Sequence, residues 1–110
     1  MAYDEALADR VRAALADHPE IDEKRMFGGL AFLLRGNMAV AVRADALLVR
    51  ADPDATDALL AARPGAHLAL MGGRTMKGWL EVPAEALTED AALTDWITTG
   101  TAYAATLPPK

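Results

Sequence analysis

Alternating apolar stretches in quick succession constrain the fold of this 110-residue chain most strongly. In the segment LAFLLRGNMAVAVRADALLVR, large apolar residues alternate with small or basic ones, which is the period of a β-strand with one buried face. Gly36-Asn37 is a strong two-residue turn signal, and Ala44-Asp45 is a weaker one. We predict strands near 24–27, 29–35, 38–43 and 46–51.

Helical signals flank this group of strands and separate it from a second group. Residues 3–17 follow helical spacing and stop before Pro19, because the residue that precedes a proline is pushed out of the helical region. Asp52 can cap a second helix that ends after Arg63, and Thr88 can cap a final helix. Two further strands are predicted at 67–71 and 77–82. This order predicts an α+β fold with two layers, a mainly antiparallel sheet carrying helices on one face.

The final helix carries an apolar stripe at helical spacing. Its members are Leu93, Trp96, Ile97 and Ala104. Gly100 lies within the stripe, where glycine weakens a helix by about 1 kcal/mol relative to alanine. We therefore expect this helix to pack closely against another element at Gly100.

Composition narrows the functional classes. The length suits one domain, residues 1–110. Cysteine and serine are absent, and the two histidines, His18 and His67, fit no metal-ligand or catalytic spacing. We therefore predict no catalytic residue, no metal and no cofactor.

The net charge of −5 disfavours direct nucleic-acid binding, and no apolar run approaches the roughly 20 residues that span a bilayer. The lack of cysteine favours a cytoplasmic location.

The alternation sorts the strand residues into two faces. The first set is bulky and apolar, and we expect it to pack under the helices. This helix face comprises Leu30, Phe32, Leu34, Met38, Val40, Val42, Leu47, Val49, Leu68, Leu70, Leu80 and Val82. The other set, which we term the outer face, comprises Ala31, Leu33, Arg35, Ala39, Ala41, Arg43, Leu48, Arg50, Ala69, Met71, Lys77, Trp79 and Glu81.

The outer face is small and apolar in its middle and basic at its ends. A solvated sheet face would be richer in threonine, lysine and glutamate. Three coverings remain open: a loop or terminus of the same chain, a second subunit, or a small ligand. Self-association through this face is our hypothesis. The candidate interface residues are Leu33, Arg35, Arg43, Leu48 and Arg50.

Two similar motifs, KRMFGG at 24–29 and RTMKGW at 74–79, lie fifty residues apart. Each combines basic residues, a methionine, a glycine and an aromatic residue. One interpretation is two structural corners, because glycine permits a bend or a close backbone approach. The other is an anion-binding rim or interaction surface beside two aromatic rings. Its candidate residues are Lys24, Arg25, Phe27, Arg74, Lys77 and Trp79.

The chain resembles the N-terminal domain of the TfoX/Sxy family, named for regulators of natural competence. The matching stretches are the YDE-containing first helix, EKRMFGGLAFLLRGNM, LLVR, GRTMKGW and the closing LPPK. The resemblance implies a small α+β fold of the secretion-chaperone class. Competence regulators of this family also carry a C-terminal domain, so a single-domain member that lacks this domain is expected.

Three functional classes therefore compete. The first is a non-enzymatic regulatory or interaction module that acts through contacts with an unidentified protein partner or as a homodimer. The second is a small-molecule or anion-binding domain that uses the two motifs. The third is an enzyme, which is disfavoured because no set of side chains forms a catalytic constellation. We expect the interaction module.

Overall fold

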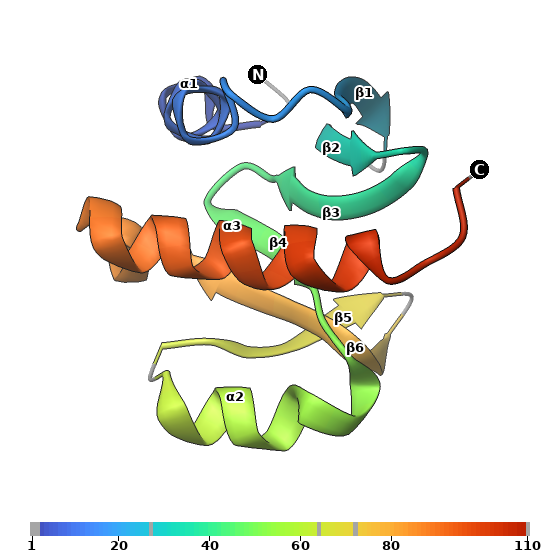
Figure 1. The fold of residues 1–110 in the computed structure, drawn as a ribbon. Coiled ribbons are helices and arrows are strands. Elements are labelled where there is room, and N and C mark those ends of the chain that lie inside the picture. The colour runs from blue at the N-terminus through green and yellow to red at the C-terminus, as the bar shows by residue number, and fades with distance from the viewer. Residues whose placement is uncertain (1–2, 27, 64, 72, 110) are drawn as a thin grey trace.

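A six-stranded sheet organises the chain (Figure 1). The computed structural model describes residues 3–26, 28–63, 65–71 and 73–109. The strands are β1 (Ile21–Met26), β2 (Gly29–Leu34), β3 (Asn37–Val42), β4 (Ala46–Arg50), β5 (His67–Met71) and β6 (Arg74–Pro83). Their order is β1-β2-β3-β4-β6-β5, and each neighbouring pair is antiparallel. The predicted α+β class with an antiparallel sheet is confirmed.

The helices begin where local capping allows. They are α1 (Glu5–Ala14), α2 (Thr56–Ala62) and α3 (Asp90–Ala105), with 3₁₀ turns η1 (Pro53–Ala55) and η2 (Ala84–Leu87). The Asp4 carboxylate accepts a 3.0 Å hydrogen bond from the N–H of Leu7, which satisfies a free donor of the first turn. Asp52 caps as predicted, but it caps η1, by accepting from the N–H of Asp54 at 2.9 Å. The second helix therefore starts as a 3₁₀ turn.

The predicted cap at Thr88 is wrong. Helix α3 begins at Asp90, and Glu89 occupies the cap position without a side-chain hydrogen bond. Residues 84–87 form η2, and Thr88 already has helical backbone angles at the end of that turn. A cap residue needs an extended backbone, so the 3₁₀ turn moves the helix start.

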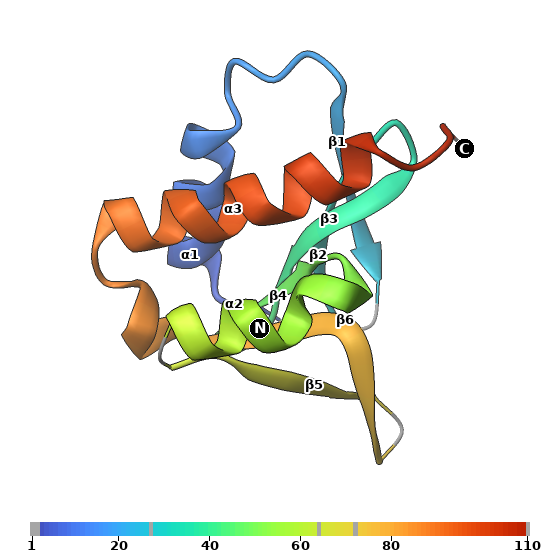
Figure 2. The same cartoon turned by 60° about the horizontal axis from the view of Figure 1, so that its bottom comes forward.

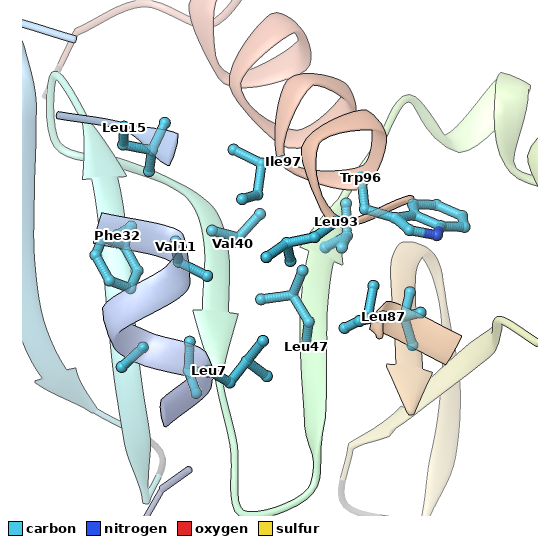
Figure 3. Close-up of a cluster of buried hydrophobic side chains, with 14 of the residues drawn as sticks. Leu7, Val11, Leu15, Phe32, Val40, Leu47, Leu87, Leu93, Trp96 and Ile97 are labelled. Atoms are coloured by element: carbon cyan, nitrogen blue, oxygen red, sulfur yellow. The ribbon is translucent and has the colours of Figure 1, made fainter. Parts of the chain in front are cut away.

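The helices cover one face of the sheet and build the main core with it. Side chains of α1, η2 and α3 interlock with the large residues of β2, β3, β4 and β6 (Figure 3). The buried members of this core are Leu7, Ala8, Val11, Leu15, Leu30, Phe32, Val40, Val42, Leu47, Val49, Ala51, Leu80, Val82, Leu87, Leu93, Trp96 and Ile97. Each fully buried large side chain contributes about 1.5–3 kcal/mol relative to its exposed state. Leu59 and Leu60 of α2 pack at the margin.

Helix α3 crosses the sheet in close contact with β3 (Figure 1). A Cβ on Gly100 would collide with the carbonyl oxygen of Ala39 and lie 2.9 Å from Cγ1 of Val40. Ala104, one turn further along, is buried against Ala39. The expectation of close packing at Gly100 is therefore confirmed, and the absent side chain is what lets the helix approach.

The predicted assignment of strand residues to the two faces holds at Trp79 and Leu80. Leu80 is fully buried in the helix-side core, whereas its neighbour Trp79 packs on the opposite face. It fails at Met38 and Ala39, which exchange faces: Ala39 packs with Ala104 on the helix side, and Met38 joins the outer face. A register shift between Phe32 and Leu33 causes this exchange, because a bulge reverses the alternation along one strand.

Two other predicted positions also differ. Leu70 was expected under the helices but is 59% exposed, because the β5–β6 hairpin extends beyond the helical layer (Figure 2). The turn after β2 is Arg35-Gly36, not Gly36-Asn37, since Leu34 pairs with Asn37. Both turn residues have positive φ, 50° and 85°, which is the primed geometry that matches strand twist.

Candidate functional site

The outer face carries an apolar cluster built from strands alone. Its buried members are Ala31, Met38, Ala41, Leu48 and Ala69, and Met26, Leu33 and Trp79 pack on them partly buried. We call this set the outer-face cluster. Within the described ranges, no helical residue belongs to it. Strands β2, β3, β4 and β5 therefore each contribute a buried residue, whereas β1 and β6 contribute the partly buried Met26 and Trp79.

The centre of the cluster is buried from solvent without any partner. Ala31 and Ala69 have no exposed surface, and Leu48 is 2% exposed. Side chains of the same face, not a helix of the described chain, provide this cover. Leu33 and Trp79 of the cluster remain half-buried. The apolar surface that this cluster offers to solvent therefore includes parts of Leu33 and Trp79.

Arg50 lies beside Trp79 on paired strands and joins the outer face to α3. Its guanidinium carbon lies over the Trp79 ring, 5.1 Å from the centroid, and over the Tyr103 ring, 5.8 Å from the centroid. Each such cation–π contact is worth about 0.5–1 kcal/mol at an accessible site. Among the described residues, no carboxylate lies within 4 Å of Arg50. We call Arg50, Trp79 and Tyr103 the arginine clamp.

The RTMKGW motif forms the corner that holds Trp79 in place. Gly78 has φ +90°, and a Cβ there would lie 3.1 Å from Cγ of Pro53 and 3.2 Å from the carbonyl oxygen of Ala51. Its N–H donates to the hydroxyl of Thr56 at 3.2 Å, and its carbonyl accepts from the N–H of Ala51 at 2.8 Å. The structural-corner interpretation is supported here, because only glycine fits this backbone.

The KRMFGG motif also contains a close backbone approach. A Cβ on Gly29 would collide with the carbonyl oxygen of Val42. Gly28 precedes it with φ +73°, a conformation that side-chain-bearing residues adopt rarely. Phe27 lies outside the described residues, as do the side chain of Met71, residue 64 and residue 72. Both motifs therefore turn the backbone at places where glycine is required.

The structure separates the candidate rim residues. Lys24 pairs with Ala31 across β1 and β2, which places it on the outer face. Its neighbour Arg25 points the other way and lies over the Tyr3 ring, 5.9 Å from the centroid. Arg74 and Lys77 are exposed on β6, and three strands stand between β1 and β6. At about 4.8 Å per strand this is roughly 19 Å of sheet. The four cations therefore do not gather around one ligand-sized point.

The candidate interface residues divide in the same manner. Leu33 and Leu48 belong to the outer-face cluster, and Arg50 stands next to it. Arg35 lies in the turn and pairs with Glu20 at 3.6 Å. Arg43 follows β3, and its carbonyl accepts from the N–H of Asp4 at 3.0 Å. Only the first three therefore sit together.

Two residues of this region were not singled out in the sequence. Tyr103 completes the arginine clamp from α3, and Thr56 is fully buried beneath Gly78. No sequence signal marks Tyr103, because its contact depends on where α3 crosses the sheet. A signal exists for Thr56: it follows the Asp52-Pro53 start and can bond back to Asp52, whose carbonyl accepts from it at 3.2 Å.

Little in the described chain resembles a reaction centre. No group of three or more metal-ligating side chains occurs among the described residues. The hydrogen bond from Arg12 to Glu23 holds the pKa of Arg12 above its ordinary value, yet arginine is charged at every working pH. A shallow hollow between α1 and β1 contains His18, whose Nδ1 is buried without a partner among the described atoms. These observations offer no nucleophile with an activating base.

The C-terminal segment is tied to the β2–β3 turn. The side-chain amide of Asn37, which is 3% exposed, donates a 2.8 Å hydrogen bond to the carbonyl oxygen of Pro108. Asn37 is the only asparagine of the chain. The end of the stretch EKRMFGGLAFLLRGNM and the closing LPPK therefore meet in space, although 71 positions separate the bonded residues.

Comparison with known proteins identifies a family. None of the helices in the described part of the chain is long and apolar enough to cross a membrane. No curated protein and no solved structure matches the chain significantly. The family model described as the TfoX N-terminal domain matches residues 13–104, a range that includes both glycine corners, the outer-face cluster and all three residues of the arginine clamp. The chain belongs to the TfoX N-terminal domain family.

Proposed function

We propose that this domain is a non-enzymatic interaction module that acts through protein–protein contacts on its outer face. One observation carries the proposal: the outer-face cluster is an apolar set of strand residues that α1, α2 and α3 leave uncovered. Tryptophan and arginine, both present here, are enriched at the centres of protein interfaces. Family membership adds support, since the TfoX N-terminal domain family is a regulatory family and not a known family of enzymes.

A homodimer is the simplest version of this proposal. A two-fold axis through the outer face would place the partly exposed Leu33 and Trp79 of one copy against the same surface of the next, as isologous interfaces require. The partly exposed apolar residues Leu33 and Trp79, with charged residues such as Lys24 on the edge strand β1, follow the usual anatomy of an interface.

The alternative function, an anion-binding domain built from the KRMFGG and RTMKGW motifs, has weaker support. Arg25 lies on the face opposite Lys24, and three strands separate β1 from β6. A cytoplasmic location stays an expectation from the lack of cysteine.

Sedimentation velocity at low and high micromolar concentration tests the proposal. Wild-type protein should sediment faster as concentration rises. Leu33→Glu, which puts a charge on the cluster, should abolish that rise. Leu70→Glu is the matched control, because Leu70 is exposed on the hairpin outside the cluster. Wild-type protein that stays monomeric at high micromolar concentration would end the homodimer version. A loss of association in Leu70→Glu alone would move the interface to the hairpin.

A further inference from the structure

We propose that the arginine clamp is a docking site for a carboxylate side chain of a protein partner that carries apolar residues next to its acidic one. The proposal deepens the proposed function and rests on it only in placing the partner on the outer face. It names the chemistry of the anchor that the outer face recognises.

The clamp leaves Arg50 with free hydrogen-bonding capacity. Trp79 and Tyr103 lie against the guanidinium group, and a guanidinium directs its five N–H donors outward in its own plane. In contrast, Arg10, Arg12 and Arg35 each have a carboxylate partner. Among the described residues, no hydrogen-bond acceptor reaches the Arg50 side chain. A planar carboxylate matches such an edge with two parallel hydrogen bonds.

The clamp is held rigidly by backbone contacts on both strands and on the helix. The N–H of Ala51, the residue after Arg50, donates a hydrogen bond to the carbonyl of Gly78, the residue before Trp79. Gly78 is in turn fixed by Thr56. On the helix side, the close approach of Gly100 to β3 fixes how far α3, which carries Tyr103, lies from the sheet. A guanidinium positioned in this way loses little conformational freedom on binding, so its directional donors favour specific recognition.

The surroundings select the rest of the ligand. Trp79 belongs both to the clamp and to the outer-face cluster, so the neighbours of a carboxylate bound to Arg50 would lie against the partly exposed side chains of Trp79 and Leu33. Those side chains favour apolar partners. The net charge of −5 and the lone cation of the clamp speak against a nucleic acid, which needs an extended basic surface.

Selection from a phage library of random 12-residue peptides tests this proposal without assuming a partner. Wild type, Leu33→Glu, Arg50→Gln and Arg50→Lys serve as targets, and Arg74→Gln is the matched control because Arg74 is exposed elsewhere on β6. Thermal melts establish that each target is folded. Should Arg50→Gln fail to fold, Arg50→Lys, which keeps the charge but loses the paired donors, replaces it.

Peptides selected on wild type should be enriched in Asp or Glu flanked by apolar residues. Their affinity, measured by titration calorimetry, should fall about tenfold for Arg50→Gln and stay unchanged for Arg74→Gln. Replacing the peptide's Glu by Gln should weaken binding to wild type equally but have no further effect on Arg50→Gln. This non-additivity identifies the contact.

Two results would overturn the proposal and separate its failure from that of the proposed function. Peptides that need an intact Leu33 but lack acidic enrichment, or bind Arg50→Gln as tightly as wild type, refute the clamp and keep the interaction face. A selection that returns no peptide sensitive to Leu33→Glu refutes both.

Discussion

The N–H of Gly78 donates its hydrogen bond to the hydroxyl of Thr56, a residue with no exposed surface, across 3.2 Å. This bond ties the middle of β6 to the first turn of α2 over 22 positions of sequence. The same hydroxyl donates to the carbonyl of Asp52. The corner that carries Trp79 is therefore set by a buried polar contact as well as by glycine geometry.

Gly78→Ala should destabilise the domain by roughly 2–4 kcal/mol, because a positive φ and a crowded Cβ position add together. Gly73→Ala is the matched control: its φ is +81°, but no described atom lies within 4 Å of an added Cβ. The control should lose only about 1–2 kcal/mol. Urea unfolding followed by far-UV circular dichroism measures both. Equal losses would show that the approach to Pro53 is not restrictive.

Thr56→Val should reduce the free energy of unfolding by about 1–3 kcal/mol, since it leaves the buried N–H of Gly78 without an acceptor. Thr56→Ser keeps the hydroxyl and should retain most of that stability. Thr101→Val removes a hydroxyl that bonds the carbonyl of Thr98 near solvent, and its effect should be small. Chemical denaturation compares the three variants. A tolerated Thr56→Val would mean that the Gly78 N–H is hydrated instead.

Gly100→Ala tests the contact between α3 and β3 through the sign of its effect. Helix propensity alone would stabilise α3 by about 1 kcal/mol. Collision of the new Cβ with Ala39 should instead produce a net loss of about 1–3 kcal/mol. Ala102→Gly on the exposed side of α3 should lose about 1 kcal/mol from propensity alone. Thermal unfolding reports both, and a stabilised Gly100→Ala would contradict the close approach.

Asn37→Ala should release the C-terminal segment at a loss of about 1 kcal/mol, because the bond to the Pro108 carbonyl is removed. The amides of Thr106 and Leu107, which bond back to α3, should then exchange faster with deuterium. Amides of β6, which β4 separates from the strand that carries Asn37, serve as the internal reference. Unchanged exchange at Thr106 and Leu107 would show that other contacts hold this segment.

Local sequence patterns predicted most of the helices and strands, because the interactions that start and orient these elements involve residues close in sequence. The capping side chain of Asp52 and the alternation around Leu80 act within a few positions, so the sequence shows them directly. The prediction at Thr88 failed because η2 is a further turn that no cap signal announces. Met38 and Ala39 exchanged faces because a bulge reverses the period of two, and a bulge depends on the partner strand.

The candidate site shows the same division at longer range. Trp79, Leu33 and Leu48 share one face because strand alternation assigns faces residue by residue. Lys24 and Lys77 were grouped by similar motifs, yet strand order keeps β1 and β6 apart. Similar composition carries no information on distance.

The amino-acid order alone specified an antiparallel α+β domain, its apolar and arginine-edged faces, and the glycines that its corners need, because periodicity and backbone sterics are local properties. Folding in three dimensions added what no local rule contains. It placed Tyr103 of α3 beside Arg50 of β4, and the hydroxyl of Thr56 beneath Gly78. Such contacts follow from how a helix crosses a sheet, which the packing of the whole core sets.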